Sequence, residues 1–209
     1  GFAIGSSVNS ECQRIEMRYC TINPGCVLYG LPSNGIHSNG FSLINDLVKQ
    51  CYLNAELDGK CSLMSPSKIR KLLKPTRIYS EIPKMLKIPE LRDNILGIAH
   101  ITGGGFPDNV RRILRGFTYN LHFNITDMFS YLSNYAKVHE IDGMYDVIML
   151  YNWIKELTRC SMKDMFRTFN CGIGMVFVMK KDVDMEVFQK HGFNEFIPLG
   201  KVIEIPDVD

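Results

Sequence analysis

Residues Gly30 to Leu43 read GLPSNGIHSNGFSL and lie between a short apolar run and a helical pattern. The apolar run, Cys26 to Leu31, is typical of a buried strand, and Ser38 and Asn39 are favoured N-cap residues just before the helical pattern. Three glycines, a proline, two asparagines and three serines are more turn-forming residues than a simple connection requires. The segment therefore predicts a strand, a glycine-rich loop and a helix start.

The rest of the chain repeats this alternation, which is typical of a layered α/β domain. We expect strands over Phe2–Val8, Cys26–Leu31, Leu96–Thr102, Gly174–Met179 and Phe196–Ile203. We expect helices after Asn39 and over Ile69–Leu73, Ile78–Leu86, Asn109–Arg115, Met144–Leu157, Met162–Phe166 and Val183–Lys190, with a helix and a loop within Phe117–Gly143. No repeat or linker is visible, so residues 1–209 are expected to form one α/β (α+β layered) domain with helices flanking a mixed β-sheet.

Composition excludes several classes of protein. The 24 basic and 22 acidic residues give a net charge of +2, which predicts no nucleic-acid partner. No apolar run approaches the roughly 18 residues that span a bilayer, and no signal peptide is visible, so we expect no membrane partner. Seven cysteines without a C-x-x-C pair favour neither a disulfide framework nor a zinc site. The expected location is the reducing cytoplasm.

The first glycine-rich loop could bind an anion. Backbone N–H groups at a helix N-terminus lack partners, and the helix dipole adds partial positive charge there, which favours phosphate. Ser33, Ser38 and Asn39 could add side-chain donors, and His37 is placed to bond to a bound anion or to titrate against it. The spacing matches neither a Walker loop nor a dinucleotide fingerprint. A purely structural strand-to-helix connection is the alternative.

A second loop repeats this arrangement in LGIAHITGGGFPDNVRRIL, residues 96–114. Ordering Gly103, Gly104 and Gly105 loses much backbone entropy, which favours close approach of the backbone to a ligand over a simple connector. His100, late in the apolar strand, is either a satisfied core histidine or a substrate contact.

Two further motifs carry candidate residues. In KPTRIYS, Thr76 is either a helix cap or a cap that also contacts ligand. In RTFNCGIGMVFV, Asn170 leads into a buried strand, and Cys171 is interpreted as structural because no cationic or histidine partner adjoins it. Two glycine-rich loops that lead into helices of one domain predict a phosphorylated ligand in a shared cleft.

The four motifs GLPSNGIHSNGFSL, KPTRIYS, AHITGGGFPDNV and RTFNCGIGM, in this order, resemble aminoimidazole ribonucleotide synthetase, the phosphoribosylformylglycinamidine cyclo-ligase family. The resemblance covers nearly the whole chain. It implies a cytoplasmic, ATP-dependent ligase of purine biosynthesis. In that family, ATP phosphorylates the formyl oxygen of formylglycinamidine ribonucleotide. The ribosyl-bearing nitrogen then attacks the activated carbon, expels phosphate and closes the imidazole.

The resemblance also implies a second part. Family members carry an N-terminal domain that holds ATP and Mg and forms much of a homodimer interface, and this chain resembles only the C-terminal half. The implied partners are formylglycinamidine ribonucleotide, the chain's own N-terminal domain and a second copy of the full-length protein. The fragment alone is expected to be inactive.

Carried over by motif, His37 and His100 are the candidates for polar contact to the reacting amide, and this chain is expected to supply no metal ligand. The expected substrate- and phosphate-binding residues are Ser33, Gly35, Ser38, Asn39, Thr76, Thr102, Gly103, Gly104, Gly105 and Asn170.

Two other functions stay open at this point. One is another ATP-dependent member of the same superfamily, such as formylglycinamidine ribonucleotide synthetase or selenophosphate synthetase. The other is a non-catalytic module that binds a phosphorylated ligand or assembles with a partner.

Overall fold

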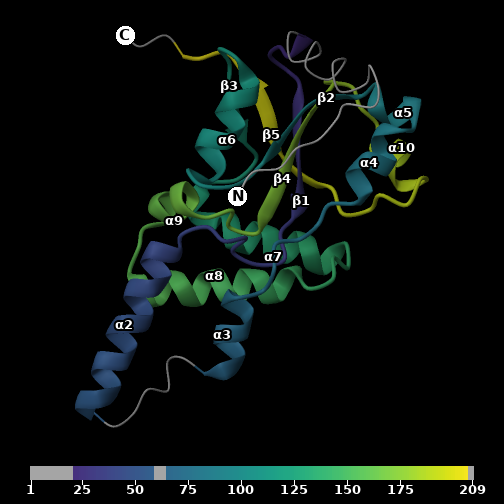
Figure 1. Cartoon of the computed structure of the whole chain (residues 1–209). Helices are drawn as coiled ribbons and strands as arrows, with labels where there is room; N and C mark the ends of the chain where they lie inside the picture. The colour runs from purple at the N-terminus through teal and green to yellow at the C-terminus, as the bar shows by residue number, and fades with distance from the viewer. Residues whose placement is uncertain (1–20, 59–64, 207–209) are drawn as a thin grey trace, which may run out of the picture.

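The computed structural model describes residues 21–58 and 65–206, and the predicted strand Phe2–Val8 lies outside these ranges. The described residues form a five-stranded sheet in the order β2-β4-β1-β5-β3 (Figure 1). The strands are β1 Val27–Pro32, β2 Ile95–His100, β3 Thr118–Leu121, β4 Ile173–Met179 and β5 Ile197–Ile203. Four of them confirm predicted strands, and the layered α/β class is confirmed.

All neighbouring strand pairs in this sheet are antiparallel, which corrects the expected mixed sheet. The order explains the difference. β4 lies between β1 and β2, and β5 lies between β1 and β3, so strands that run in the same direction are never neighbours. The helical connections from β1 to β2 and from β4 to β5 therefore each skip one strand position, and the connection from β2 to β3 skips three.

Helices flank this sheet. They are α2 Phe41–Asp58, α3 Pro66–Leu72, α4 Glu81–Leu86, α5 Pro89–Arg92, α6 Gly105–Leu114, α7 Met128–Val138, α8 Met144–Thr158, α9 Met162–Thr168 and α10 Glu186–Gln189. α6 begins four residues before its predicted start, because Pro107 falls in the first turn, where a missing N–H breaks no helical bond. α2 and α3 extend away from the sheet beside α8 (Figure 1).

The segment from Phe117 to Gly143 differs most from expectation. It contains the predicted helix, α7, but begins with strand β3 and the short 3-10 helix Ile125–Asp127. β3 has four residues and pairs with β5 at the edge of the sheet. A run this short has too little alternation to identify a strand from sequence.

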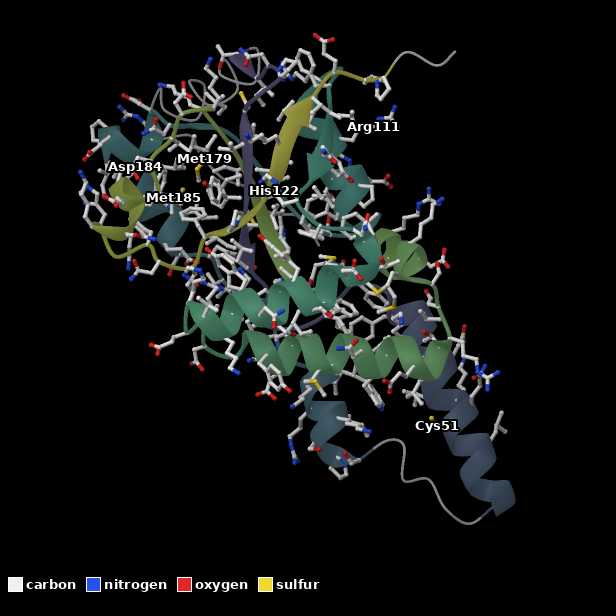
Figure 2. All side chains as sticks on the ribbon, turned by 180° about the vertical axis from the view of Figure 1, so that it is seen from behind. Cys51, Arg111, His122, Met179, Asp184 and Met185 are labelled. Carbon is white, nitrogen blue, oxygen red and sulfur yellow. The ribbon has the colours of Figure 1, made fainter. Side chains whose placement is uncertain are left out.

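Side chains alternate between two cores on opposite faces of the sheet. In β4, Val176 and Val178 belong to the larger core with α6, α7, α8 and α9, whereas Phe177 and Met179 belong to the smaller core with α4, α5 and α10. Figure 2 shows Met179 near Met185 on the side of the smaller core. Burial on both faces explains why β4 reads as a continuous apolar run.

The topology brings three loops to one end of the sheet. β1 and β2 are both antiparallel to β4, which lies between them. The carboxyl ends of β1 and β2 therefore lie beside the amino end of β4, with Pro32 opposite Ile173 and His100 opposite Met175. The loops that follow β1 and β2 and the loop that precedes β4 meet there.

Within residues 21–58 and 65–206, no helix combines the length and the apolar character that crossing a membrane requires.

Candidate functional site

Backbone hydrogen bonds join the three loops at this end of the sheet. The N–H of Ser33 donates to the carbonyl of Gly172 over 2.8 Å, and the N–H of Ile101 donates to the carbonyl of Gly174 over 2.9 Å. The Asn39 amide donates to the carbonyl of Ile101 over 3.3 Å, which ties the first loop to the end of β2. Three of the motifs recognised in the sequence thus form one contiguous unit.

Asn170 is the central buried group of this unit and has no exposed surface. Its side-chain oxygen accepts hydrogen bonds from the Ser33 hydroxyl (2.7 Å), the Tyr151 hydroxyl (2.9 Å) and the N–H of Gly172 (2.9 Å). Its side-chain nitrogen donates to the carbonyl of Gly35 over 2.9 Å. Asn170 and Ser33 therefore use their polar atoms to hold the first loop against β4, not to face solvent.

The loops contain non-glycine residues in the left-handed region of backbone conformation. His37 has φ 51°, Ser38 has φ 62° and Cys171 has φ 50°. Such residues are uncommon and persist only where the surrounding structure compensates for the strain. Here the turn bond from the N–H of Asn39 to the carbonyl of Ile36 (3.0 Å) and the Asn170 contacts provide that compensation.

The three consecutive glycines of the second loop have different surroundings. A Cβ at Gly105 would overlap the backbone of Phe166 and Arg167, and one at Gly104 would overlap the Asp108 side chain. Both glycines also have positive φ. Gly103, in contrast, is exposed, and a Cβ there would meet nothing within 4 Å. Internal packing therefore explains Gly104 and Gly105, and only Gly103 has free space for a ligand.

Asn109 organises this second loop from the first turns of α6. Its side-chain nitrogen donates to the carbonyl of Gly105 (2.7 Å) and also approaches the carbonyls of Thr102 and Gly103, both at 3.3 Å. The Thr102 hydroxyl donates to the Asn109 side-chain oxygen over 3.3 Å. From the sequence, Asn109 was expected only as a helix start. An asparagine four residues after a glycine run was the available signal.

Three rings face one another where the first and second loops meet. The ring centroids of His37 and His100 are 6.1 Å apart. The ring centroid of Tyr79 lies 6.2 Å from that of His37 and 6.3 Å from that of His100. A Cβ on Gly174 of β4 would overlap the Tyr79 hydroxyl, so glycine at this position makes room for the ring. His37 is buried and His100 is exposed.

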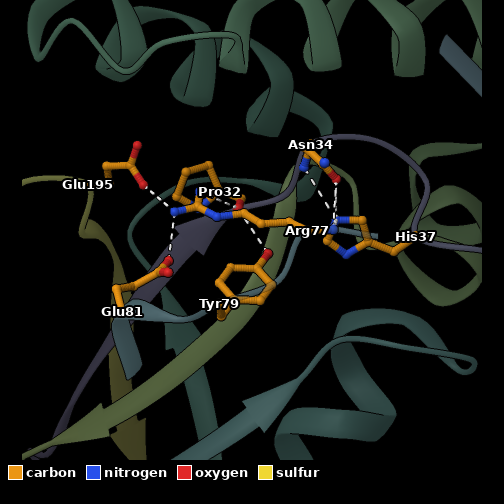
Figure 3. A network of polar contacts seen from close by, with 7 residues as sticks. All are labelled: Pro32, Asn34, His37, Arg77, Tyr79, Glu81 and Glu195. Atoms are coloured by element: carbon orange, nitrogen blue, oxygen red, sulfur yellow. Dashed lines mark hydrogen bonds and ion pairs between the residues drawn. The ribbon is translucent and has the colours of Figure 1, made fainter. Parts of the chain in front are cut away.

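Arg77 anchors the segment before α4 (Figure 3). Its guanidinium group donates to Glu195 (2.6 Å), Glu81 (2.7 Å) and the carbonyl of Pro32 (3.2 Å). It also lies 4.9 Å from the centre of the Tyr79 ring. Because two carboxylates already neutralise it, Arg77 acts here as an internal anchor.

The surroundings of His37 favour its neutral form. Burial is the main cause, and the nearby His100 and Arg77 add to it, so the pKa of His37 falls from 6.5 to about 4. Burial also lowers the pKa of His100. In the ligand-free chain at neutral pH, His37 is therefore neutral and offers no positive charge to a phosphate.

This pKa predicts acid sensitivity. The unfolded chain binds more protons than the folded chain between pH 6.5 and 4, so the free energy of unfolding should fall as pH falls through that range, by at most about 3 kcal/mol for His37. Urea titrations at several pH values should show a smaller pH dependence in His37→Gln, and a lesser reduction in His100→Gln. If the free energy of unfolding depends on pH equally in His37→Gln and the unchanged chain, His37 is not the source of the acid sensitivity.

The proposed site residues divide into two groups by exposure. Ser33, Gly35, His37, Asn39, Gly105 and Asn170 are buried, whereas Ser38, His100 and Gly103 are exposed and Thr76, Thr102 and Gly104 are partly exposed. The buried group builds the loops, and the exposed group presents free surface to a ligand in this structure. Asn34, Tyr79 and Tyr151 were not predicted as site residues, although the first two lie inside the quoted motifs.

The described residues contain no group of three or more His, Cys, Asp or Glu side chains that could hold a metal ion. Near the loops, Glu81 and Glu195 are already paired with Arg77. We therefore derive no chemical step through a metal from the part of the chain that the structure describes.

Residues 23–208 match the family described as AIR synthase related protein, C-terminal domain. The chain belongs to this family. The resemblance carried by the four sequence motifs is thereby confirmed, and the loops described above hold three of these motifs together.

Relatives in this family carry informative names. The chain is 32% identical over 203 residues to a phosphoribosylformylglycinamidine cyclo-ligase of Caldicellulosiruptor saccharolyticus, covering 94% of this chain and 51% of the relative. It is 35% identical to the enzyme of the same name from Chromobacterium violaceum, covering 86% of this chain and 44% of the relative. A relative from Vigna unguiculata, 32% identical over 86% of this chain and 40% of its own length, is named as chloroplastic/mitochondrial. The chain thus spans about half the length of these relatives and matches their C-terminal part.

Proposed function

We propose that this chain is the substrate-recognition half of a phosphoribosylformylglycinamidine cyclo-ligase. The complete enzyme would use ATP to close formylglycinamidine ribonucleotide to aminoimidazole ribonucleotide, releasing ADP and phosphate. The observation that carries this proposal is the meeting of the loops after β1 and β2 with the start of β4, at an end of the sheet where Ser38, His100 and Gly103 are exposed.

The phosphate of the substrate is best placed at the start of α2. The first N–H groups of an α-helix have no partners within the helix and carry partial positive charge. The exposed Ser38 hydroxyl precedes this 18-residue helix by three positions. At α6, the other helix that follows a glycine loop, the Asp108 carboxylate lies beside Gly104 and would repel an anion. We therefore assign phosphate to α2 and the non-phosphate part of the substrate to the region of His100 and Gly103.

ATP and Mg²⁺ are proposed to bind mainly outside this chain. The relatives named as cyclo-ligases are about twice as long, and the described residues offer no acidic cluster for Mg²⁺. The role of this chain in the reaction would be to hold the substrate and orient its reacting amide, while a separate N-terminal domain delivers the phosphoryl group. Homodimer formation by the full-length protein is proposed from the family resemblance alone.

A cytoplasmic location is proposed from the cysteines. Among the described residues, Cys26, Cys160 and Cys171 form no disulfide, and two of these three are buried. Free buried thiols suit a reducing compartment.

Calorimetric titration of this chain with formylglycinamidine ribonucleotide tests the proposal. We expect weak, saturable binding and no ATP-dependent product formation by the chain alone. Ser38→Ala should weaken binding about ten-fold, because it removes one hydrogen bond to a charged group and leaves the backbone unchanged.

Ser130→Ala, an exposed serine on α7, is the matched control and should bind like the unchanged chain. Absence of binding at millimolar substrate would show that this half does not recognise substrate by itself. ATP-dependent turnover by the pure chain would contradict the proposal that ATP binds mainly outside this chain.

A further inference from the structure

The Nδ1 atom of His37 is a buried polar atom without a hydrogen-bond partner among the residues that the structure describes. The His37 side chain is only 4% exposed. Nearly all buried polar atoms in folded proteins are paired, so an unpaired one in a loop of this kind needs an explanation. Whether Nδ1 offers a lone pair or an N–H group depends on the tautomer of the ring.

Asn34 determines that tautomer. Its carboxamide orientation is fixed, because its nitrogen donates to the carbonyl of Pro75 (3.1 Å) and its oxygen accepts from the N–H of Arg77 (3.1 Å). The same oxygen lies 2.8 Å from Nε2 of His37. An amide oxygen can only accept, so the proton of the neutral imidazole must be on Nε2.

The alternative tautomer is disfavoured by the same distances. Nε2 could instead accept from the N–H groups of Asn34 (3.3 Å) and Arg77 (3.4 Å), but both contacts are longer. Two lone pairs, on Nε2 and on the Asn34 oxygen, would then face each other across 2.8 Å. A doubly protonated ring would place a positive charge in a buried position near Arg77, and burial already lowers the pKa of His37 to about 4.

The surrounding contacts keep Asn34 in place. Arg77 is held by Glu81, Glu195 and the carbonyl of Pro32, so its backbone N–H points reliably at the Asn34 oxygen (Figure 3). Figure 3 shows dashed lines from the Asn34 side chain to the place where the Arg77 backbone and the His37 ring meet. The hydrogen bonds that link Arg77, Asn34 and His37 therefore fix the tautomer of His37 as well as the conformation of the first loop.

We propose that Asn34 is a positioning residue that holds His37 as the neutral Nε2–H tautomer, so that Nδ1 presents a lone pair to an N–H or O–H donor of the ligand. This inference rests on the proposed function and adds to it. The amide and amidine N–H groups of formylglycinamidine ribonucleotide are suitable donors, whereas its phosphate has only acceptors when fully ionised. Because Nδ1 has almost no exposed surface in the ligand-free chain, a ligand donor reaches it only after a local rearrangement of the side chains around the ring.

Long-range ¹H–¹⁵N NMR of the labelled chain reads the tautomer directly, because protonated and unprotonated imidazole nitrogens have different ¹⁵N shifts. The chain has five histidines, so single His→Gln variants assign the signals. We expect a protonated Nε2 and an unprotonated Nδ1 for His37 at neutral pH. Asn34→Ala should convert this to a mixture of tautomers, and Asn34→Asp, which keeps an acceptor, should restore Nε2–H and raise the pKa of His37.

Asn94→Ala is the control. Asn94 also bonds through its side-chain amide, to the carbonyl of Glu90, but lies just before β2 at the opposite end of the sheet. It should leave the His37 signals unchanged. A protonated Nδ1 in the unchanged chain, or an unchanged tautomer in a folded Asn34→Ala, would overturn the proposal.

Addition of formylglycinamidine ribonucleotide separates this inference from the proposed function. We expect the Nδ1 resonance of His37 to shift as it accepts a hydrogen bond. Binding without a change at Nδ1 would refute the ligand contact. Failure to bind would contradict substrate recognition by this half alone, while the tautomer measured in the free chain would still decide the role of Asn34.

Discussion

Replacing Asn170 with alanine is expected to lower the free energy of unfolding by about 3 to 5 kcal/mol. The substitution leaves the Ser33 hydroxyl, the Tyr151 hydroxyl and the N–H of Gly172 without their shared acceptor in a fully buried position. It also removes the donor to the carbonyl of Gly35. Urea denaturation followed by circular dichroism measures the change.

The control for this prediction is Asn134→Ala. Asn134 is exposed on α7, so its replacement should change stability by no more than about 0.5 kcal/mol. A loss below about 1 kcal/mol for Asn170→Ala would mean that the three loops do not depend on this side chain. The unit formed by the loops would then have to be held mainly by its backbone hydrogen bonds.

The second large effect is expected from Gly105→Ala. A Cβ at this position would overlap the carbonyl oxygen of Phe166 and the backbone of Arg167, and backbone atoms cannot move aside as a flexible side chain can. The residue also has φ 63°, which is strained for alanine. We expect a loss of about 3 kcal/mol or more in the free energy of unfolding, measured by the same urea titration.

Gly103→Ala is the matched control two residues away. Nothing lies within 4 Å of a Cβ there and φ is not in the left-handed region, so stability should change by less than about 1 kcal/mol. Similar losses for both variants would show that α6 does not pack on the end of α9 as described. If Gly103→Ala instead folds normally but binds the substrate more weakly, Gly103 is the glycine that the ligand approaches.

Much of the fold could be predicted from local patterns. β1, β2, β4 and β5 were recognisable because buried strands carry runs of β-branched and aromatic residues, and helix α2 because Ser38 and Asn39 precede an amphipathic pattern. The edge strand β3 was missed because four partly exposed residues have no distinctive pattern. Its conformation depends on hydrogen bonds to β5, which is distant in sequence.

The site residues were likewise predictable only where local sequence carries the information. The sequence indicated which loops matter, through their glycines and polar residues, but could not distinguish a residue that builds a loop from one that faces a ligand. Asn170 and Ser38 both looked like ligand contacts, yet one is completely buried and the other is exposed. Asn34 was adjacent to the candidates and was not chosen, because its partners at Pro75 and Arg77 are more than 40 residues away.

The sequence by itself determined the α/β class, most helices and strands, and the family, because each depends on short-range periodicity or on motifs read in order. The tertiary structure alone decided the antiparallel strand order, the meeting of three loops at one end of the sheet and the environment of His37. Those features depend on contacts between residues far apart along the chain. Burial and hydrogen-bond partners, which fix the pKa and proton position of His37, exist only once those contacts have formed.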